Sequence, residues 1–164
     1  MLRTIIAAAF VAIVLASASS ASSSATVAHA EIGPYTTVHA GVVIDAGVTA
    51  HAQIIATASG RVVLRVVAEG LVPGGTFAVH VHDGVCTDYL GHHRYDPAAP
   101  GTRDNEIWLD LDANAAGRAV DEVQVAPFAL EQPLSLVIHQ HSNPDVGDWP
   151  PGPRIACGNL ELGG

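Results

Sequence analysis

The stretch of sequence that decides the fold is residues 52–82, AQIIATASGRVVLRVVAEGLVPGGTFAVHVH. It holds three short apolar runs, separated by turn signals at Ser59-Gly60 and at Val72-Pro73-Gly74-Gly75. Short runs rich in β-branched residues and bounded by glycine and proline are typical of antiparallel strands joined as a meander. The stretch therefore predicts an all-β protein.

Runs of the same kind continue towards the C-terminus, and no helical periodicity of useful length competes with them. They are Glu106 to Leu111, Val120 to Val125, Leu134 to His139 and Arg154 to Leu162. About eight antiparallel strands with these breaks indicate an immunoglobulin-like Greek-key β-sandwich or flattened barrel. Two long irregular segments, 83–103 and 140–153, are rich in Pro, Gly, Asp and His, and long loops on a rigid sandwich usually carry function.

Residues 1–30 have the pattern of a secretory signal peptide: Arg3, an apolar run over 5–15, and then small residues. Ala28-His29-Ala30 has the form of a cleavage site, which predicts a mature start near Glu31. The apolar run is too short to span a bilayer, although the serine-rich stretch after it leaves a different cut or a retained anchor open. Residues 31–50 are either a leader or a first edge strand, and residues 51–164 form the expected single domain.

The composition argues against two classes of partner. The chain has no lysine, and beyond the expected signal six arginines face sixteen acidic residues. So acidic a protein is a poor candidate for binding nucleic acid or an anionic membrane, and an anionic substrate needs a local positive charge. Cys86 and Cys157 are the only cysteines, and in an exported protein the pair predicts one disulfide rather than two buried thiols.

Histidines gather at the ends of two predicted strands and in the first long loop. His80 and His82 are two apart on a strand and therefore share a face, while His139 ends another strand. Imidazoles collected in this way suit Cu(II), Zn(II) or Ni(II), and tetragonal nitrogen coordination favours copper. Each histidine alone is equally compatible with a surface position, as are the loop and flanking residues His92, His93 and His141. No role is assigned to His29, His39 or His51.

Several segments in order along residues 52–162 resemble the copper/zinc superoxide dismutases. They are Phe77 to His82, Cys86, Gly91-His92-His93 leading to Asp96-Pro97, Val137-Ile138-His139, and Gly152 to Gly158. The resemblance implies that fold, superoxide as substrate, and a copper ion held by His80, His82, one histidine of the first long loop, and His139. It also implies a disulfide between Cys86 and Cys157 and an active-site arginine, Arg154, that receives superoxide.

The loop ligand is either His92 or His93. The Gly-x-His frame from Gly91 favours His93, whereas counting from Cys86 favours His92. We select His93 as the fourth ligand and as the group that delivers a proton during catalysis.

The sequence departs from the two-metal enzymes in a consistent way. No histidine lies between His93 and His139, where the family has its zinc ligands, and the loop before Arg154 is short. These departures resemble the copper-only branch of the family, so zinc is not expected. A carboxylate or a backbone carbonyl must then orient the loop histidine in place of zinc, and the candidate carboxylates, each of which could instead be a solvated surface acid, are Glu106, Asp110 and Asp96.

The sequence thus predicts a secreted, periplasmic or cell-surface superoxide dismutase that uses copper. The main rival is a copper-binding or copper-storage protein on the same fold, since a fold does not confer an activity. An arginine beside an intact ligand set argues against that rival. A structural sandwich with a degenerate site would require the matched histidines to be coincidental. The sequence does not indicate an oligomeric state.

Overall fold

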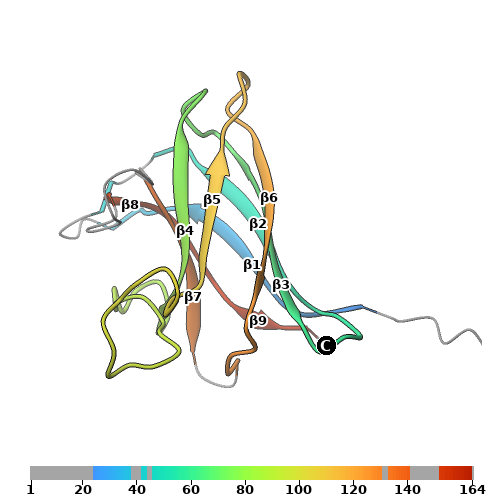
Figure 1. The fold of residues 1–164 in the computed structure, drawn as a ribbon. Coiled ribbons are helices and arrows are strands. Elements are labelled where there is room, and N and C mark those ends of the chain that lie inside the picture. Colours follow the sequence, from blue (N-terminus) through green and yellow to red (C-terminus); the bar gives the residue numbers. More distant parts are fainter. Residues whose placement is uncertain (1–23, 38–41, 44–45, 131–132, 141–151, 164) are drawn as a thin grey trace, which may run out of the picture.

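A computed structural model describes residues 24–37, 42–43, 46–130, 133–140 and 152–163. These residues form an all-β fold of nine strands (Figure 1): β1 Ala25–Pro34, β2 Thr49–Ala56, β3 Val62–Glu69, β4 Thr76–Asp83, β5 Trp108–Asp112, β6 Ala119–Val125, β7 Leu134–His139, β8 Arg154–Asn159 and β9 Glu161–Leu162. The predicted strands from β2 onward are confirmed within three residues at each end, and the run predicted over 154–162 is divided into β8 and β9.

The strands form an antiparallel sandwich that is nearly closed into a barrel. The hydrogen-bonded order is β5-β4-β7-β8-β1-β2-β3-β6, with β9 beside β1. One sheet contains β1, β2, β3, β6 and β9, and the other contains β4, β5, β7 and β8, which the end of β1 joins through Gly33 and Pro34. The end strands β5 and β6 lie side by side in Figure 1. Because β3 pairs with β6 and β4 with β7, the chain crosses between the sheets as the predicted Greek key requires.

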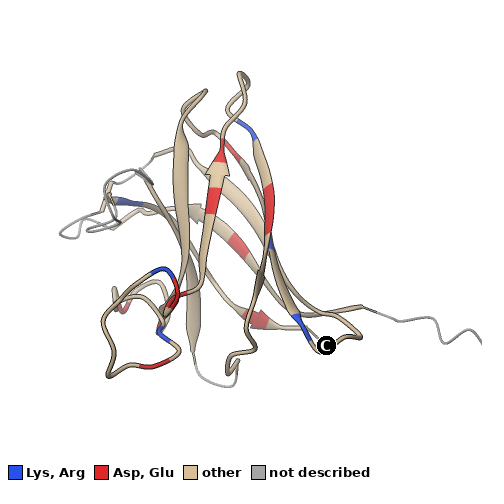
Figure 2. Ribbon diagram, in the orientation of Figure 1, with Lys and Arg blue, Asp and Glu red and all other residues tan. Residues whose placement is uncertain are grey.

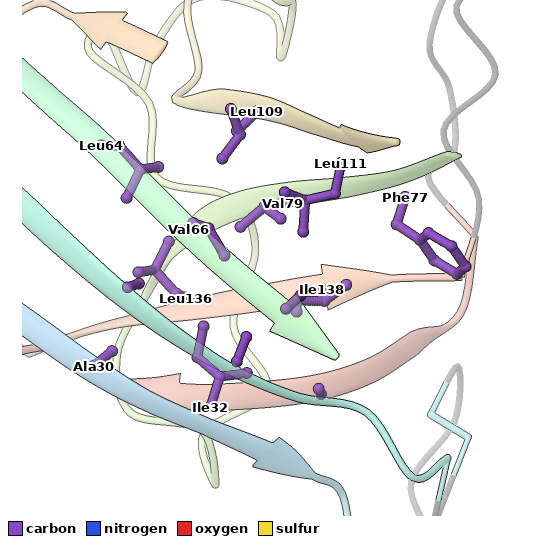
Figure 3. Close-up of a cluster of buried hydrophobic side chains, with 14 of the residues drawn as sticks. Ala30, Ile32, Leu64, Val66, Phe77, Val79, Leu109, Leu111, Leu136 and Ile138 are labelled. Carbon is purple, nitrogen blue, oxygen red and sulfur yellow. The ribbon is translucent and has the colours of Figure 1, made fainter. Parts of the chain in front are cut away.

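The core lies between the two sheets and is entirely apolar. Alternate residues of β2 and β3 are buried, as expected for strands with one solvent face. The side chains that meet inside include Ile32, Leu64, Val66, Val79, Leu111, Leu136 and Ile138 (Figure 3). This packing makes the two sheets a rigid support for whatever lies on their outer faces.

The outer face of the β4 sheet is also covered, which is unusual for a sandwich. In β4 every residue from Phe77 to His82 is buried, and β7 is buried along its whole length. The loop of residues 84–107 between β4 and β5 (green to yellow in Figure 1) folds back over this end of β4 through the antiparallel bridge of His82 with His92. The histidines of β4 and β7 therefore lie between a sheet and a loop, away from the apolar core.

The N-terminal boundary differs from the expectation. Strand β1 begins at Ala25, six residues before the expected mature start at Glu31, and Ala28 and Ala30 are fully buried in the core. Ala28 and Ala30, the small residues of the expected cleavage motif, pack between the sheets. The fold therefore includes residues that the sequence pattern assigned to a signal peptide or leader. Among the described residues, no helix is long and apolar enough to cross a membrane.

Candidate metal centre

Two strands and one loop bring four imidazoles together. His80 and His82 lie on the outer face of β4, and His139 is the last residue of the neighbouring β7. His92, from the covering loop, lies over them, with its ring centroid 3.8 Å from that of His80 and 4.6 Å from that of His82. One ring nitrogen from each of His82, His92 and His139 can be chosen so that all three lie within 4.8 Å of one another, the separation expected of ligands to one metal ion.

Two ring nitrogens that both lack hydrogen lie close together in the cluster. The Nδ1–H of His82 donates to the carbonyl oxygen of Leu90 at 2.9 Å, and the Nδ1–H of His139 donates to that of Gly152 at 2.7 Å. In neutral rings the proton is then on Nδ1, so each Nε2 carries a lone pair. These two Nε2 atoms are 3.3 Å apart and cannot hydrogen bond to each other. A cation between them would remove this repulsion.

His92 is held by a buried carboxylate. Its Nδ1 lies 2.7 Å from Oε2 of Glu106, whose side chain is almost fully buried. The same oxygen is 3.7 Å from Nδ1 of His80. Glu106 was one of three carboxylates predicted to orient the loop histidine, and the structure brings it to that place. The other two are engaged elsewhere: Asp110 contacts Arg103 and Trp108, and Asp96 accepts from the backbone of its own turn.

The structure does not bring His93 into the cluster. Its Nδ1 lies 2.7 Å from Oδ1 of Asp83, and its ring packs beside Phe128 at 5.8 Å. The bridge of His82 with His92 and the bond from the His93 backbone N–H to the Val81 carbonyl give this part of the loop a strand-like course along β4. Neighbouring side chains of an extended segment point to opposite sides, so only one of the two histidines can face the cluster. That residue is His92, and our selection of His93 is corrected here.

Burial keeps the four imidazoles neutral. Desolvation lowers the pKa of His80 far below its usual range and lowers the pKa of His82 to about 2. It also lowers the pKa values of His92 and His139 to about 4. Burial has the opposite effect on Glu106 and raises its pKa. Neutral imidazole is the form that binds a metal ion, so the cluster is ready to bind one at neutral pH.

Arg154 stands at the edge of the cluster. It begins β8, paired with His139, and its Nη2 donates to the Leu90 carbonyl oxygen at 2.6 Å. That oxygen also accepts the His82 Nδ1–H, so one carbonyl orients both a histidine of the cluster and the arginine. The positive charge of Arg154 contributes to the lowered pKa values of His82, His92 and His139, which places it within electrostatic reach of all three.

The predicted disulfide is present. Cys86, in the covering loop, is bonded to Cys157 of β8, 71 positions further along the chain. The Cys86 backbone N–H also donates to Oδ1 of Asn159 at 2.8 Å. The loop that carries His92 is therefore tied to the strand that carries Arg154.

Of the other histidines that the structure describes, His29 and His51 take no part in the cluster. His29 and His51 form surface pairs with Glu161 and Glu31. His39 and His141 lie outside the described residues, as does most of the loop before Arg154. Sequence reasoning missed the carbonyl groups of Leu90 and Gly152, because a backbone acceptor leaves no trace in residue type.

Comparison with known proteins supports the fold. No family model and no curated protein matches the sequence. Among solved structures, a SOD-like protein from Bacillus subtilis is similar with a TM-score of 0.58 at 17% identity, over 81% of this chain and 97% of that one. A double mutant of a Bacillus subtilis SOD-like protein gives 0.57 at 18%, over 80% and 95%. Superoxide dismutase 5 of Candida albicans with Cu(II) gives 0.55 at 18%, over 85% and 94%. The resemblance read from the sequence is thus confirmed, and the chain has the fold of the copper/zinc superoxide dismutase family.

Proposed function

We propose that this chain is a copper-dependent superoxide dismutase that works without zinc. The observation that carries the proposal is the pair of hydrogen-free Nε2 atoms on His82 and His139, 3.3 Å apart in a buried site. Both rings are fixed by carbonyl groups, and one of these carbonyls also holds Arg154. A preorganised cation site beside an anchored positive side chain suits a redox metal that acts on a small anion.

The ligands in this proposal are His80, His82, His92 and His139. Both ring nitrogens of His80 are buried without a hydrogen-bond partner, and metal binding through one of them would remove part of this cost. Four imidazoles and no thiolate favour copper among the common redox metals. Copper bound there would supply the one-electron chemistry by which one superoxide is oxidised to oxygen and a second is reduced to hydrogen peroxide.

Arg154 attracts and orients the substrate. The protein as a whole is acidic, with a net charge of −9, and repels superoxide at long range. A guanidinium keeps its charge at any working pH and offers paired donors to a small anion. Its bond to the Leu90 carbonyl oxygen fixes one end of the guanidinium at the edge of the cluster.

In this proposal His92 donates the proton that peroxide formation requires, and Glu106 orients the His92 ring. Glu106 accepts the Nδ1 proton of His92 and fixes the ring, so that Nε2 faces the cluster. When Nε2 takes up a proton, the buried imidazolium gives it up readily, because burial lowers the pKa of His92 to about 4. His92 can therefore donate that proton to the superoxide that is being reduced to peroxide, while Glu106 keeps the His92 ring in place.

The donor set argues against a zinc site of the family's usual kind. The second group of possible metal ligands among the described residues contains His80, His92 and Glu106. It shares His92 with the first group and adds His80 and one carboxylate, whereas zinc in the two-metal enzymes takes, besides the shared histidine, two further histidines and an aspartate. Glu106 occupies the position next to His92 that zinc would need.

Copper storage on the same fold is the alternative. A storage protein has no need of an arginine anchored to the carbonyl that also orients a copper ligand, so the Arg154 contact favours the enzyme. We propose export to a secreted, periplasmic or cell-surface location, on the basis of the signal-like Arg3, the apolar run over 5–15 and the disulfide.

The deciding experiment measures metal content and superoxide consumption on the same purified protein. The chain is loaded with copper and zinc together, dialysed and analysed for both metals, and its reaction with superoxide is followed by stopped flow. We expect one copper per chain, no retained zinc, and rapid turnover. One tightly held zinc per chain would contradict the copper-only assignment, and bound copper without turnover would favour the storage protein.

A further inference from the structure

His80 differs from the other three histidines of the cluster in how it is held. The rings of His82 and His139 are anchored by backbone carbonyls, and that of His92 by Glu106. Neither ring nitrogen of His80 has a hydrogen-bond partner among the described residues, although the side chain is fully buried. Metal-bound histidines usually donate their second nitrogen to a neighbouring group, and this fixes the ring. Something other than a hydrogen bond must orient His80.

Two rings enclose His80 from different sides. His92 stacks on it with centroids 3.8 Å apart and ring planes 14° apart. Trp108 contacts it edge to face, with centroids 4.1 Å apart and planes 73° apart. Trp108 is the direct cross-strand partner of His80 in the β4–β5 ladder, so its side chain lies on the same outer face. Of the two, Trp108 is the neighbour that belongs to the rigid sheet.

Trp108 is itself fixed by charged neighbours. Its Nε1–H donates to Oδ1 of Asp110 at 2.8 Å. Asp110 forms an ion pair with Arg103, and the Arg103 guanidinium lies over the Trp108 ring, 4.7 Å from its centroid. Asp110 thus holds the edge of the indole by a hydrogen bond, and Arg103 lies on its face. The ion pair between Asp110 and Arg103 links these two contacts.

We propose that Trp108, clamped by Asp110 and Arg103, is the positioning residue for His80. An edge-to-face contact with a fixed indole restricts the rotation of the imidazole as a hydrogen bond would, and it leaves both nitrogens of His80 free for a metal ion. The inference rests on the proposed copper site. It adds that one ligand, His80, is held by an aromatic contact from β5, whereas the other three ligands are held by hydrogen bonds.

The test uses variants of the full chain that loosen the clamp and leave every proposed ligand in place. Asp110→Ala and Arg103→Gln release the indole, and Trp108→Phe keeps an aromatic ring but loses the bond to Asp110. Asp112→Ala is the matched control: it removes a carboxylate from the same strand, whose contact is the Thr76 hydroxyl at 2.7 Å. Circular dichroism and thermal unfolding of each metal-free variant establish that it is folded.

The first measurement is the Cu(II) dissociation constant, from competition with a chelator of known affinity, together with the Cu(II) electron paramagnetic resonance spectrum. Loss of an outer contact to a metal ligand typically weakens binding by 10–100-fold. We expect about tenfold weaker binding and an altered spectrum for Asp110→Ala, Arg103→Gln and Trp108→Phe, and wild-type behaviour for Asp112→Ala.

The second measurement is fluorescence in a Trp149→Phe background, where Trp108 is the remaining tryptophan. Added Cu(II) should quench its emission at one equivalent.

The outcomes separate this inference from the proposed function. If the wild type binds no copper, the proposed function fails. If the wild type binds one copper while the three clamp variants keep its affinity and spectrum, the copper site stands and the role of Trp108 is refuted. Unquenched Trp108 emission in a copper-loaded protein would also refute it, because the indole would then lie far from the metal ion.

Discussion

His92 and His93 are adjacent in the chain and yet face opposite sides of the covering loop. His92 stacks on His80 and contacts Glu106, whereas His93 contacts Asp83 and Phe128. Which of the two faces inward is decided by the loop's register against β4, set by the bond from the His93 N–H to the Val81 carbonyl. A local motif cannot show that register, so the frame counted from Gly91 gave the wrong neighbour.

Replacing each of the two histidines by alanine should have unequal effects on copper binding. His92→Ala removes a nitrogen from the cluster and should weaken Cu(II) affinity at least tenfold, with a changed Cu(II) spectrum. His93→Ala should change affinity by less than about twofold, because its ring contacts Asp83 and Phe128 and lies outside the cluster. A chelator competition assay on both variants measures this, and equal losses would show that His93 also takes part.

Arg154→Gln should lower the second-order rate constant for superoxide by about tenfold, which corresponds to about 1.4 kcal/mol in the barrier. The glutamine amide can still donate to the Leu90 carbonyl, but the charge that attracts the anion is gone. Stopped-flow measurements over a range of salt concentrations give a second check, since added salt should slow the wild type more steeply than the variant. An unchanged rate constant would remove Arg154 from the mechanism and strengthen the storage alternative.

Gly101 is constrained by the buried carboxylate of the site. A Cβ added there would lie 2.5 Å from Oε1 of Glu106, so Gly101→Ala should push this side chain away from His92. Gly91 and Gly101 both line a cavity of 410 Å³ next to Glu106, but a Cβ added at Gly91 meets nothing within 4 Å. We expect Gly101→Ala to alter the Cu(II) spectrum and the pH profile of turnover while Gly91→Ala preserves both. Identical spectra for the two variants would mean that Glu106 does not orient His92.

At the scale of elements, the strands were predictable and the covering loop was not. Strands β2 to β7 have alternating or continuous apolar residues between glycine and proline turns, and these patterns are local. The path of the loop of residues 84–107 depends on the disulfide with β8, the bridge to β4 and the bridge of Arg94 with Glu106, all of them contacts between distant residues. Sequence reasoning therefore found the ligand types and the disulfide but could not decide which carboxylate and which histidine meet.

The first half of strand β1 was missed because its inward residues, Ala28 and Ala30, are alanines. Ala28 and Ala30 are small enough to resemble a cleavage motif, yet both are fully buried, and Ala25 to Ala30 pair with β2. We predict that the mature chain begins at or before Ala25. A protein that begins at Glu31 would lose several ladder hydrogen bonds, at about 1 kcal/mol each, out of a total stability of roughly 5–15 kcal/mol.

Two measurements check this boundary. The intact mass of the exported protein gives its first residue directly. Urea unfolding of proteins that begin at Ala25 and at Glu31 should show a much lower midpoint for the shorter one. Equal midpoints would mean that the first half of β1 contributes nothing to the fold.

Over the whole molecule, the net charge is negative, although the proposed substrate is an anion. Figure 2 shows acidic positions spread over strands and loops and few basic ones. The sequence predicted this imbalance and the need for a local positive charge, since both depend on composition alone. What composition could not show is that the histidines of the cluster are buried deeply enough to remain neutral, and that property controls how the stability of the metal-free protein depends on pH.

The metal-free protein should lose stability as the pH falls below about 6.5. An imidazole has a pKa near 6.5 in the unfolded chain, whereas burial lowers the pKa values of His92 and His139 to about 4 and those of His80 and His82 further. Between these values the unfolded chain binds protons that the folded protein excludes, so acid favours unfolding. Each such proton contributes at most about 1.4 kcal/mol per pH unit. Glu106 acts in the opposite sense, because burial raises its pKa and makes the folded state bind a proton more readily than the unfolded chain, which offsets part of the loss. Urea unfolding of the apoprotein at pH 7.5, 6.5, 5.5 and 4.5 measures the slope, and His139→Gln should make it shallower by about one proton. A slope that is zero over this range, or unchanged in His139→Gln, would show that the imidazoles are solvated and that the site is far more open than its geometry indicates.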